Sequence, residues 1–529
     1  MSEQYFAGVD VGSASVRAGI FANDGTRVGF ATRPITQFHP KANFVEQSSR
    51  EIWQMICEAM NEAVASSGIA KDQIISLGFD ATCSLVAIDQ NGQGVSISES
   101  GEPERDIIMW MDHRATAEAS EINKTGDEAL RYVGGEVSVE MELPKVLWLK
   151  RNLPERYKTI WRLFDLADFL VWKATDSDSA SVCTLTCKWN YLAHENRFSQ
   201  SLLQAVKLDD LTEKVPPAIL RLGEKAGKLS AQAAEALGLS TDVIVASGII
   251  DAHAGGLALV GSSPEQSLAL ISGTSNCHMV VSREPVMVPG VWGPYWDAML
   301  PDWWLNEGGQ SAAGALVEWA VRQNASWPEL QNEAEKSGKN PFAVLNEWVA
   351  DLELREELPT RHLHVLGDHH GNRSPRANPH AKGAVYGLTL EQGRDALARI
   401  YLATLQAVAY GTRHIIETIH QAGSEITSLK VCGGATKNPL WLREYADITG
   451  CDLHLARDED VVTLGAALLG AVACDGFSSL PDAAVSMVGI GKTVKANPDK
   501  KAFHDAKYKV YLQMYDDQQR AQKEMQTFL

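Results

Sequence analysis

Three short stretches of the sequence combine carboxylates, hydroxyl groups and glycines in a way that suits phosphate chemistry. The first is the turn Asp10-x-Gly12-Ser13-x-Ser15. Its backbone NH and hydroxyl groups can face a phosphate, while its carboxylate can hold Mg²⁺ through water. Turns of this form are also common in plain hairpins. The first stretch alone could therefore be an ordinary turn that binds no ligand.

The second stretch runs from Ala246 to Gly256, after an apolar strand and into a glycine-rich helix start. Asp251 stands at the end of that strand, where it can accept the proton of a hydroxyl that attacks a γ-phosphorus. The alternative is a helix N-cap, a position that aspartate also favours. Helix caps rarely need small residues on both sides, which favours the catalytic interpretation.

The third stretch, Lys430 to Pro439, predicts a strand that enters the turn Gly433-Gly434 and then a helix. Glycines at such a turn let the backbone approach a flat ring or a phosphate closely. A tight turn without any ligand explains these glycines equally well. It does not explain the other two stretches.

The elements that must position these residues occur twice in the chain. Residues 5–21 predict a strand, a turn of small residues and a second strand, and residues 267–282 predict a similar unit. Two such units, far apart in the sequence, indicate a duplicated architecture in which each half opens with a phosphate-contacting turn.

Helical stretches alternate with short apolar strands between and after these hairpins, for example over residues 49–66 and 397–422. This alternation predicts an α/β fold in both halves. A chain of 529 residues is too long for one core, and we expect it to divide near Gly261 into residues 1–262 and 263–529.

Composition excludes several classes of function. The formal net charge of −19 disfavours a nucleic-acid partner, which requires a dense basic face. A nucleotide remains compatible, because backbone NH groups and Mg²⁺ can hold its phosphates in an acidic protein. No apolar run is long enough for a membrane span and no basic leader precedes one, so we expect a cytoplasmic protein without membrane contact.

The eight cysteines are scattered, and the nearest pair, Cys183 and Cys187, has no second pair at zinc-ligand spacing. We expect reduced and mostly buried thiols rather than disulfides or metal ligands.

The order and spacing of the three stretches resemble those of the FGGY carbohydrate kinases, over nearly the whole chain. Departures from the family pattern occur at Glu140 and Glu142, where small or hydroxyl residues are usual, and at Arg399. The resemblance implies two ribonuclease-H-like lobes of the actin and hexokinase type, with a cleft between them. Further matches are Asn43–Gln47 with Trp53, Trp110–Arg114, Lys145–Leu149 and Gly371–Pro375.

The resemblance also implies roles for individual residues. Asp251 looks like the general base, and Asp10 with Asp251 would lie nearest to Mg²⁺. The N-terminal lobe would then carry the sugar site and the base, and the C-terminal lobe the nucleotide. The expected ATP contacts are Gly12, Ser13, Ser15, Gly273, Thr274, Gly314, Gly433, Gly434, Ala435 and Asn438.

On the sugar side, the runs Phe79–Ser84 and Trp110–Arg114 resemble ribulokinases rather than glycerol kinases. The ammonium group of Lys188 can donate to a ketose carbonyl or hydroxyl, and Glu307 can accept from hydroxyls. A solvated surface lysine is the alternative for Lys188, although its neighbours are not a charged run. The expected substrate contacts are Cys83, Asp112, His113, Lys188, Asp251 and Glu307.

These expectations combine into an ATP-dependent kinase that converts D-ribulose into D-ribulose 5-phosphate. L-ribulose, xylulose or a polyol remain alternative acceptors, and an actin-like ATP-gated binding protein is a further alternative. Such a machine would not need the polar set of Asp112, Lys188, Asp251 and Glu307. The expected partners are the sugar and MgATP, and a homodimer is left open.

Overall fold

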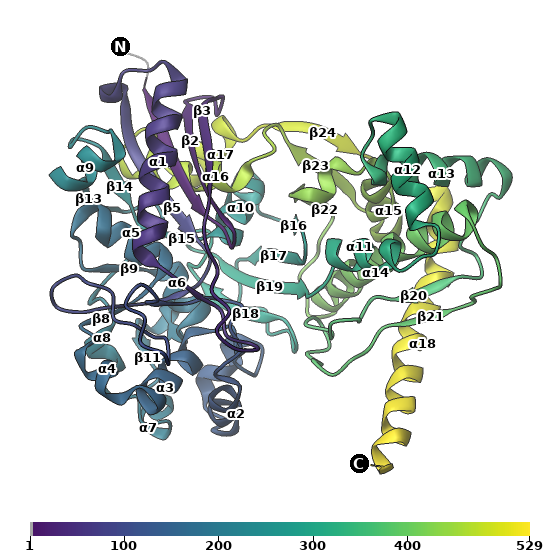
Figure 1. The fold of residues 1–529 in the computed structure, drawn as a ribbon, viewed down its shortest axis with the longest axis horizontal. Helices are drawn as coiled ribbons and strands as arrows, with labels where there is room; N and C mark the ends of the chain where they lie inside the picture. The colour runs from purple at the N-terminus through teal and green to yellow at the C-terminus, as the bar shows by residue number, and fades with distance from the viewer. Residues whose placement is uncertain (1–3, 529) are drawn as a thin grey trace.

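Two mixed sheets lie side by side in the computed structural model, which describes residues 4–528, and helices cover their faces (Figure 1). The first sheet contains β1 (Tyr5–Val11), β2 (Ser15–Ala22), β3 (Arg27–Pro34), β5 (Ile74–Ala81), β13 (Lys225–Lys228), β14 (Ile244–Ala246) and β15 (Ile249–Ile250). The second contains β16 (Ser267–Ser272), β17 (Asn276–Ser282), β18 (Trp292–Trp296), β19 (Trp304–Gln310), β22 (Ser428–Cys432), β23 (Asp452–Ala456) and β24 (Ile490–Val494).

The two sheets share one topology. In the first, the antiparallel ladder β3-β2-β1 continues from β1 into the parallel strands β5 and β14. In the second, the antiparallel ladder β19-β17-β16 continues from β16 into the parallel strands β22 and β23. This repetition confirms the duplicated α/β architecture that the two hairpins predict.

The central strand β1 shows why the sequence chooses this arrangement. All seven of its residues are buried, as expected for a strand that has neighbours on both edges and helices on both faces. Tyr5 pairs with Ala22 and Val11 with Val16, so the short turn between β1 and β2 carries the small residues that the sequence analysis singled out.

Helix α1 (Ser49–Ser67) covers one face of the first sheet and illustrates how local signals set its limits. The hydroxyl of Ser48 accepts from the backbone NH of Glu51, and Gly68 ends the helix in the left-handed conformation. Its apolar side chains recur at helical spacing, so one stripe is buried against β2 and β3.

The remaining helices surround the two sheets. In the first half they are α2 (Thr116–Lys124), α3 (Glu142–Asn152), α4 (Pro154–Thr159), α5 (Leu166–Thr175), α6 (Val182–Lys188), α7 (Gln200–Ala205), α8 (Leu211–Lys214), α9 (Ala231–Leu237) and α10 (Asp251–Val260). In the second half they are α11 (Gly314–Arg322), α12 (Trp327–Ser337), α13 (Pro341–Arg355), α14 (Arg394–Gln421), α15 (Pro439–Thr449), α16 (Val461–Ala473), α17 (Leu480–Met487) and α18 (Lys501–Met525).

Smaller sheets complete the fold. A four-stranded sheet joins β4 (Glu46–Gln47), β7 (Ile107–Ile108), β6 (Leu85–Ile88) and β8 (Arg162–Asp165). Two-stranded pairs form between β9 (Ser179–Ser181) and β12 (Ala218–Leu220), β10 (Tyr191–Leu192) and β11 (Arg197–Phe198), and β20 (His364–Leu366) and β21 (Ala384–Tyr386).

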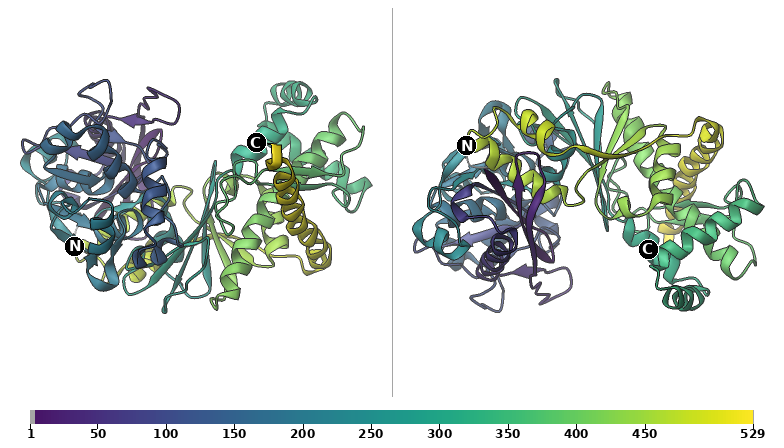
Figure 2. Two further views of the ribbon diagram at one scale, coloured as in Figure 1. Left: turned by 90° about the horizontal axis from the view of Figure 1, so that it is seen from below. Right: turned by 90° about the horizontal axis from the view of Figure 1, so that it is seen from above.

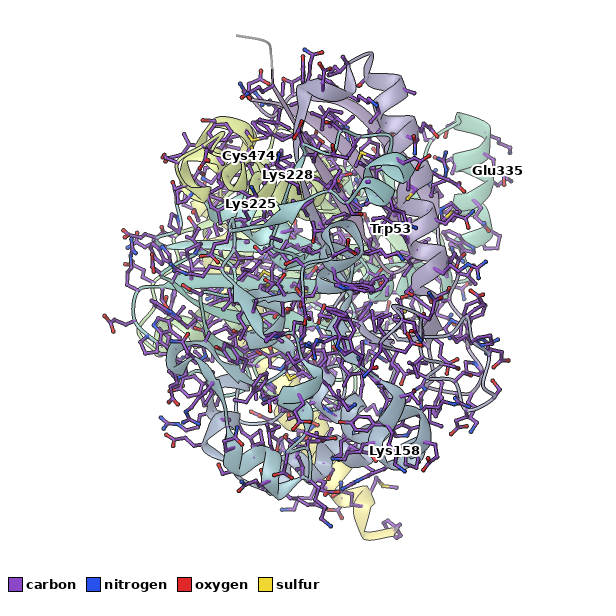
Figure 3. The ribbon with its side chains drawn as sticks, turned by 90° about the vertical axis from the view of Figure 1, so that its left-hand side faces the viewer. Trp53, Lys158, Lys225, Lys228, Glu335 and Cys474 are labelled. Carbon is purple, nitrogen blue, oxygen red and sulfur yellow. The ribbon has the colours of Figure 1, made fainter. Side chains whose placement is uncertain are left out.

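Helix α16 comes late in the sequence but packs on the first sheet, at backbone distance. A Cβ atom at Gly8 of β1 would overlap the carbonyl oxygen of Thr463, and one at Gly78 of β5 would overlap that of Ala466. Figure 3 labels Cys474, just after α16, in the same part of the view as Lys225 and Lys228 of β13. The two halves of the chain therefore share packing, and the division at residue 262 remains a prediction.

Helix α10 lies against α16 and completes this shared region. A Cβ atom at Gly465 of α16 would overlap the carbonyl oxygen of Ala254 in α10. By contrast, the long helix α18 lies on the side of the second sheet that faces away from the first (Figure 2). Tyr508 and Tyr511 of α18 pack there on Tyr410 of α14, with ring centroids 6.0 and 5.7 Å apart. Within residues 4–528, no helix has both the length and the apolar character to cross a membrane.

The contact between α10 and α16 yields a stability prediction with a matched control. Gly465→Ala should lower the free energy of unfolding by about 1–3 kcal/mol, because the new methyl group overlaps the backbone of α10. Gly255→Ala, on the facing helix, should stay within about 1 kcal/mol of the parent, since its new Cβ meets only side chains, the nearest atom lying 3.3 Å away. Urea denaturation of both variants measures this, and equal losses would contradict the proposed backbone contact.

Candidate active site

Three carboxylates meet where adjacent strands of the first sheet end. Asp10 on β1 pairs in parallel register with Asp80 on β5. Strand β15 pairs with the end of β5, Ile250 opposite Ala81, so Asp251 follows at the same edge as the first residue of α10. Asp251 is therefore not the N-cap of α10, which is Ile250.

Arg17 supplies positive charge to this cluster. It stands opposite Asp10 in the β1–β2 ladder and forms ion pairs with Asp10 and, at 3.2 Å, with Asp460. Burial raises the pKa of Asp10, which Arg17 partly offsets, and burial together with the charge of Asp10 holds the pKa of Asp80 well above its usual range. One guanidinium group thus faces several carboxyl groups, and the cluster contains more acidic than basic side chains.

The pKa of Asp251 is raised to about 7, first by burial and then by the negative charge of Asp10. Its Oδ1 accepts a hydrogen bond from the backbone NH of Ala252 at 2.7 Å. A carboxylate with a pKa near neutrality suits general-base catalysis, because it can both hold and release a proton under working conditions.

The cluster also fits a divalent cation. The two carboxyl groups of Asp10 and Asp80 face each other, and no other described residue donates a hydrogen bond to either oxygen of Asp80 or to Oδ1 of Asp10, although all three atoms are buried. Buried carboxylate oxygens without donors are costly, and oxygen atoms are the ligands that Mg²⁺ prefers. Asp10, Asp80 and Asp251 could hold such an ion together.

The first turn leaves space beside its half-buried glycine. The NH of Gly12 donates to the carbonyl of Ser15, and a Cβ at Gly12 would lie 3.6 Å from that oxygen, an ordinary contact. The indole NH of Trp110 donates to the hydroxyl of Ser13 at 2.9 Å, so Trp110 supports the turn. The fold itself does not require glycine at position 12.

The second turn is built in the same way and is joined by helix α11. The NH of Gly273 donates to Ser275, and the NH of Gly314 donates to the carbonyl of Gly273 at 3.0 Å. A Cβ at Gly273 would meet nothing closer than 3.9 Å. The NH of Ala313 bonds to Thr274, so the start of α11 and this turn form one unit.

The third stretch lies beside the second turn. A Cβ at Gly433, where φ is +92°, would overlap the carbonyl oxygen of Ser272, so this glycine is required by the fold. At Gly434 the nearest atom would be 3.9 Å away and the residue is exposed. Ala435 is buried. Gly434, like Gly12 and Gly273, has space above it.

Asn438 has a clear structural role. It is the N-cap of helix α15, because its Oδ1 accepts from the NH of Trp441. The same oxygen accepts from Nδ2 of Asn346, and Nδ2 of Asn438 donates to the hydroxyl of Tyr401 at 2.7 Å. A contact between Asn438 and a nucleotide remains a prediction.

A second group of polar side chains lies beside the carboxylates. The Nζ atom of Lys188, at the end of α6, is 4.0 Å from Oε2 of Glu307 on β19 and 4.6 Å from the ring centre of Trp292. Lys188 is 4% exposed, so the alternative of a solvated lysine is wrong. Burial alone would lower the pKa of Lys188, but Glu307 raises it well above its usual value.

The histidine of the second stretch supports this pair. Nε2 of His253 lies 3.5 Å from Oε2 of Glu307 and 3.5 Å from Sγ of Cys187. Burial lowers the pKa of His253 to about 4, so the ring is neutral near pH 7. Cys183 joins Cys187 and His253 within 4.8 Å, and all three are buried.

The other expected sugar contacts differ in their surroundings. Cys83 is buried, and after burial itself the charge of Lys188 is the strongest influence on the pKa of its thiol, which burial raises. Asp112 is fully buried, and its oxygens accept from Arg114 and from the NH of Val45. His113 is exposed, with Nε2 3.8 Å from Glu140. A substrate contact of Asp112 remains a prediction, and in this structure Asp112 fixes Arg114.

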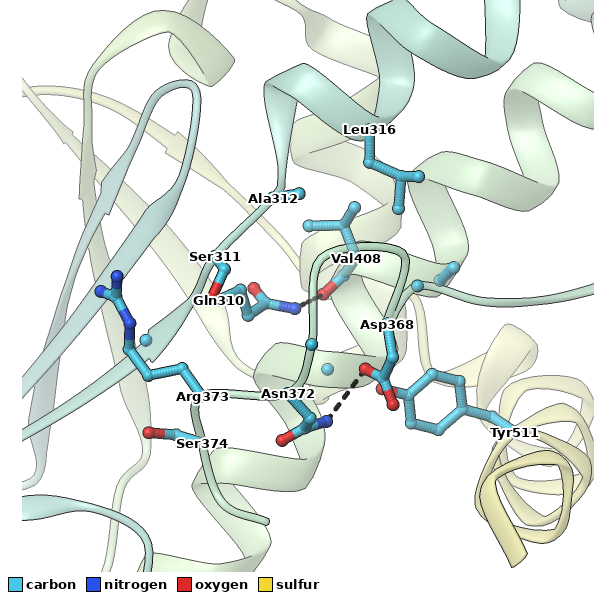
Figure 4. A pocket seen from close by; sticks show the side chains of 15 residues that line it. Gln310, Ser311, Ala312, Leu316, Asp368, Asn372, Arg373, Ser374, Val408 and Tyr511 are labelled. Carbon is cyan, nitrogen blue, oxygen red and sulfur yellow. Dashed lines mark hydrogen bonds between the residues drawn. The ribbon is translucent and has the colours of Figure 1, made fainter. Parts of the chain in front are cut away.

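A pocket in the C-terminal half adjoins this region but contains none of the expected site residues. It lies between β19, α14 and the loop 367–374 (Figure 4). Asn372 donates to Asp368 at 2.9 Å inside it, and Arg373 points away from Asp368 and Tyr511.

Several charged residues of the site are not predicted from the sequence. Asp80 belongs to the run Phe79–Ser84, and its position at the end of a predicted strand is the signal that could have identified it as a site residue. Arg17 stands opposite Asp10 on the second strand of the hairpin, but the sequence does not predict its ion pairs with Asp10 and Asp460. Arg373 lies 3.3 Å from Glu140, a residue that stands out in the sequence only as a departure from the family pattern.

Comparison with curated proteins gives long matches. An FGGY carbohydrate kinase domain-containing protein of Xenopus laevis is 43% identical, over 98% of each chain. The D-ribulokinase of Saccharomyces cerevisiae is 35% identical, over 90% of this chain and 72% of its own.

Solved structures agree in fold. A xylulose kinase from Rhodospirillum rubrum matches with a TM-score of 0.82 at 21% identity, over 97% of this chain and 99% of that one. A Plasmodium falciparum glycerol kinase with ADP matches with a TM-score of 0.80 at 17% identity, over 97% and 98%.

The family models for the two domains of the FGGY carbohydrate kinases cover most of the chain. The N-terminal domain model matches residues 5–258 and the C-terminal domain model matches residues 268–474. The chain therefore belongs to the FGGY family of carbohydrate kinases.

Proposed function

We propose that this kinase transfers the γ-phosphoryl group of MgATP to a terminal hydroxyl of a small ketose, D-ribulose above all. The observation that carries the proposal is the meeting of Asp10, Asp80 and Asp251 at one sheet edge, with the polar pair of Lys188 and Glu307 beside them. A kinase needs a base, a metal site and a means of holding its acceptor, and these residues supply all three.

In the proposed reaction Asp251 accepts the proton of the acceptor hydroxyl. The hydroxyl oxygen then bonds to the γ-phosphorus, while the bond from that phosphorus to the bridging oxygen of ADP breaks. Mg²⁺, when bound, would neutralise negative charge on the phosphates. Asp10 and Asp80 would hold the ion, and Arg17 fixes the position of Asp10.

ATP as the donor is supported by the three open glycines, Gly12, Gly273 and Gly434. Each lies on a turn between elements, and none is required by a steric clash or by a positive φ angle. A glycine that leaves the space above a turn open lets a phosphate or a base approach the backbone closely. The glycerol kinase of similar fold holds ADP.

D-ribulose as the acceptor is supported by the yeast D-ribulokinase, at 35% identity, and by the paired charges of Lys188 and Glu307. A ketose offers a carbonyl to the ammonium group and hydroxyls to the carboxylate. L-ribulose, xylulose and polyols are the competing acceptors. An ATP-gated binding protein would have no use for this buried polar pair.

Variants of the adjacent glycines Gly433 and Gly434 should distinguish an effect on nucleotide binding from an effect on folding. Gly434→Ala should raise the KM for ATP by about tenfold or more, with the melting temperature almost unchanged, because a methyl group there enters the space left for the ligand. Gly433→Ala should lower the melting temperature, since it overlaps Ser272. An unchanged KM for ATP in Gly434→Ala would contradict the placement of the nucleotide.

Replacement of the proposed base tests the chemistry. Asp251→Asn should reduce kcat by about 10²–10⁴, because asparagine keeps the shape but accepts no proton. ATP affinity by titration calorimetry and the melting temperature should change little. Asp242→Asn, which removes an exposed acid, is the control. Turnover of Asp251→Asn within a few-fold of the parent would refute the assignment.

A panel of acceptors tests the substrate. D-ribulose should give a higher kcat/KM than L-ribulose, xylulose, ribitol or glycerol. The phosphate should be added at the hydroxyl farthest from the carbonyl. Lys188→Met should reduce kcat/KM for D-ribulose by about 10- to 100-fold, because a hydrogen bond from a charged group is lost. ATP hydrolysis without sugar should change far less. A higher kcat/KM for xylulose or glycerol than for D-ribulose would contradict the assignment of D-ribulose as the acceptor. It would not contradict the assignment of the protein as a kinase.

A further inference from the structure

An ion pair joins the two halves of the chain beside the sugar-binding pair. Glu140 precedes helix α3 in the first half, and Arg373 lies in the loop after β20 in the second. Both carboxylate oxygens of Glu140 lie 3.3 Å from Nη2 of Arg373, and Nε2 of His113 lies 3.8 Å from Oε1. The two side chains are 17% and 19% exposed, so water screens the pair only in part.

Glu140 is charged under all working conditions. Burial alone would raise its pKa, but Arg373 and then His113 lower it to about 2. The guanidinium group of Arg373 is therefore already neutralised before any substrate enters.

The ion pair is continuous with the group of Lys188 and Glu307. Cζ of Arg373 lies 5.3 Å from the ring centre of Trp292, and Nζ of Lys188 lies 4.6 Å from the same ring. Arg373 also packs over Gly309, where a Cβ would lie 2.9 Å from its Cδ. Gly309 and Glu307 are two residues apart on β19, so both face the same side of the sheet.

The charges of this region balance. Two cations, Lys188 and Arg373, are matched by two carboxylates, Glu307 and Glu140. A neutral sugar can bind here through hydrogen bonds without leaving a charge unpaired. A sugar acid would bring a third carboxylate to two cations that are already paired, and each resident carboxylate would repel it.

We propose that Glu140 determines acceptor specificity: by pairing with Arg373 it restricts the kinase to neutral sugars and rejects sugar acids of the same length. This inference rests on the proposed function, in which the Lys188 and Glu307 region holds the acceptor. Glu140 acts through Arg373, so removing its charge should free a cation that can bind a carboxylate.

The test compares D-ribulose with D-ribonate, the five-carbon sugar acid. In Glu140→Gln the ratio of kcat/KM for D-ribonate to that for D-ribulose should rise by about tenfold or more, chiefly through a lower KM for D-ribonate. Glu140→Asp keeps the charge and should keep the ratio low. Glu136→Gln removes an exposed charge four residues away and is the surface control.

The double variant Glu140→Gln with Arg373→Met shows whether Arg373 carries the effect, and its ratio should return to the parental value. Calorimetric affinity for D-ribonate provides a readout that needs no turnover, and melting temperatures identify misfolding. An unchanged ratio in folded Glu140→Gln would overturn the proposal. So would an equal loss for both compounds, which would mean that the ion pair only joins the halves.

The proposed acceptor is tested separately by the parent protein. If the parent phosphorylates another neutral sugar in preference to D-ribulose, the substrate assignment fails. The effect of Glu140 is then measured with that sugar and its own acid, and the same outcomes decide it.

Discussion

The close packing of helix α16 on the first sheet is the constraint on which the site depends. Gly8 and Gly78 let the helix approach β1 and β5 at backbone distance, and Gly465 lets α10 approach in turn. Asp251 begins α10, and Asp460 is the residue just before α16. A shift of α16 would therefore move the proposed base and one partner of Arg17 together. Since interiors are packed as densely as crystals, such a shift has no room to be absorbed.

Two electrostatic environments lie next to each other on this framework. Around Asp10, Asp80 and Asp251, acid exceeds base and the pKa values are raised, which suits the capture of a cation and of a proton. Around Lys188 and Glu307 the charges balance. The division separates a region suited to highly charged phosphates and metal from one suited to a neutral, hydroxyl-rich molecule.

Much of the fold could be predicted from the sequence, because strands, turns and caps are encoded locally. The strands around Asp10 and Ser272 and the helix that begins near Ser49 were all expected within a few residues of their observed limits. Helix α16 shows the limit: its apolar run marks it as buried, but nothing in it tells which sheet it covers.

The candidate site divides in the same way. Residues at turns and strand ends, such as Gly12 and Asp251, carry signals in their neighbours, whereas ion pairs between distant segments do not. Glu140 and Arg373 are 233 residues apart in the sequence, so their pairing appears only in three dimensions. For Asp112, the resemblance predicts a substrate contact, and the structure shows a hydrogen bond from Arg114 that the sequence does not predict.

The position of α16 also bears on how the protein is made. During synthesis the strands of the first sheet leave the ribosome early, yet the helix that covers β1 and β5 follows only after the second sheet's central strands. Until residue 473 has emerged, that face of the first sheet is apolar and uncovered, which exposes the nascent chain to aggregation and to chaperones. The N-terminal half is thus expected to complete its core only when synthesis is nearly finished, and a ribosome stalled before α16 would hold an unfinished domain.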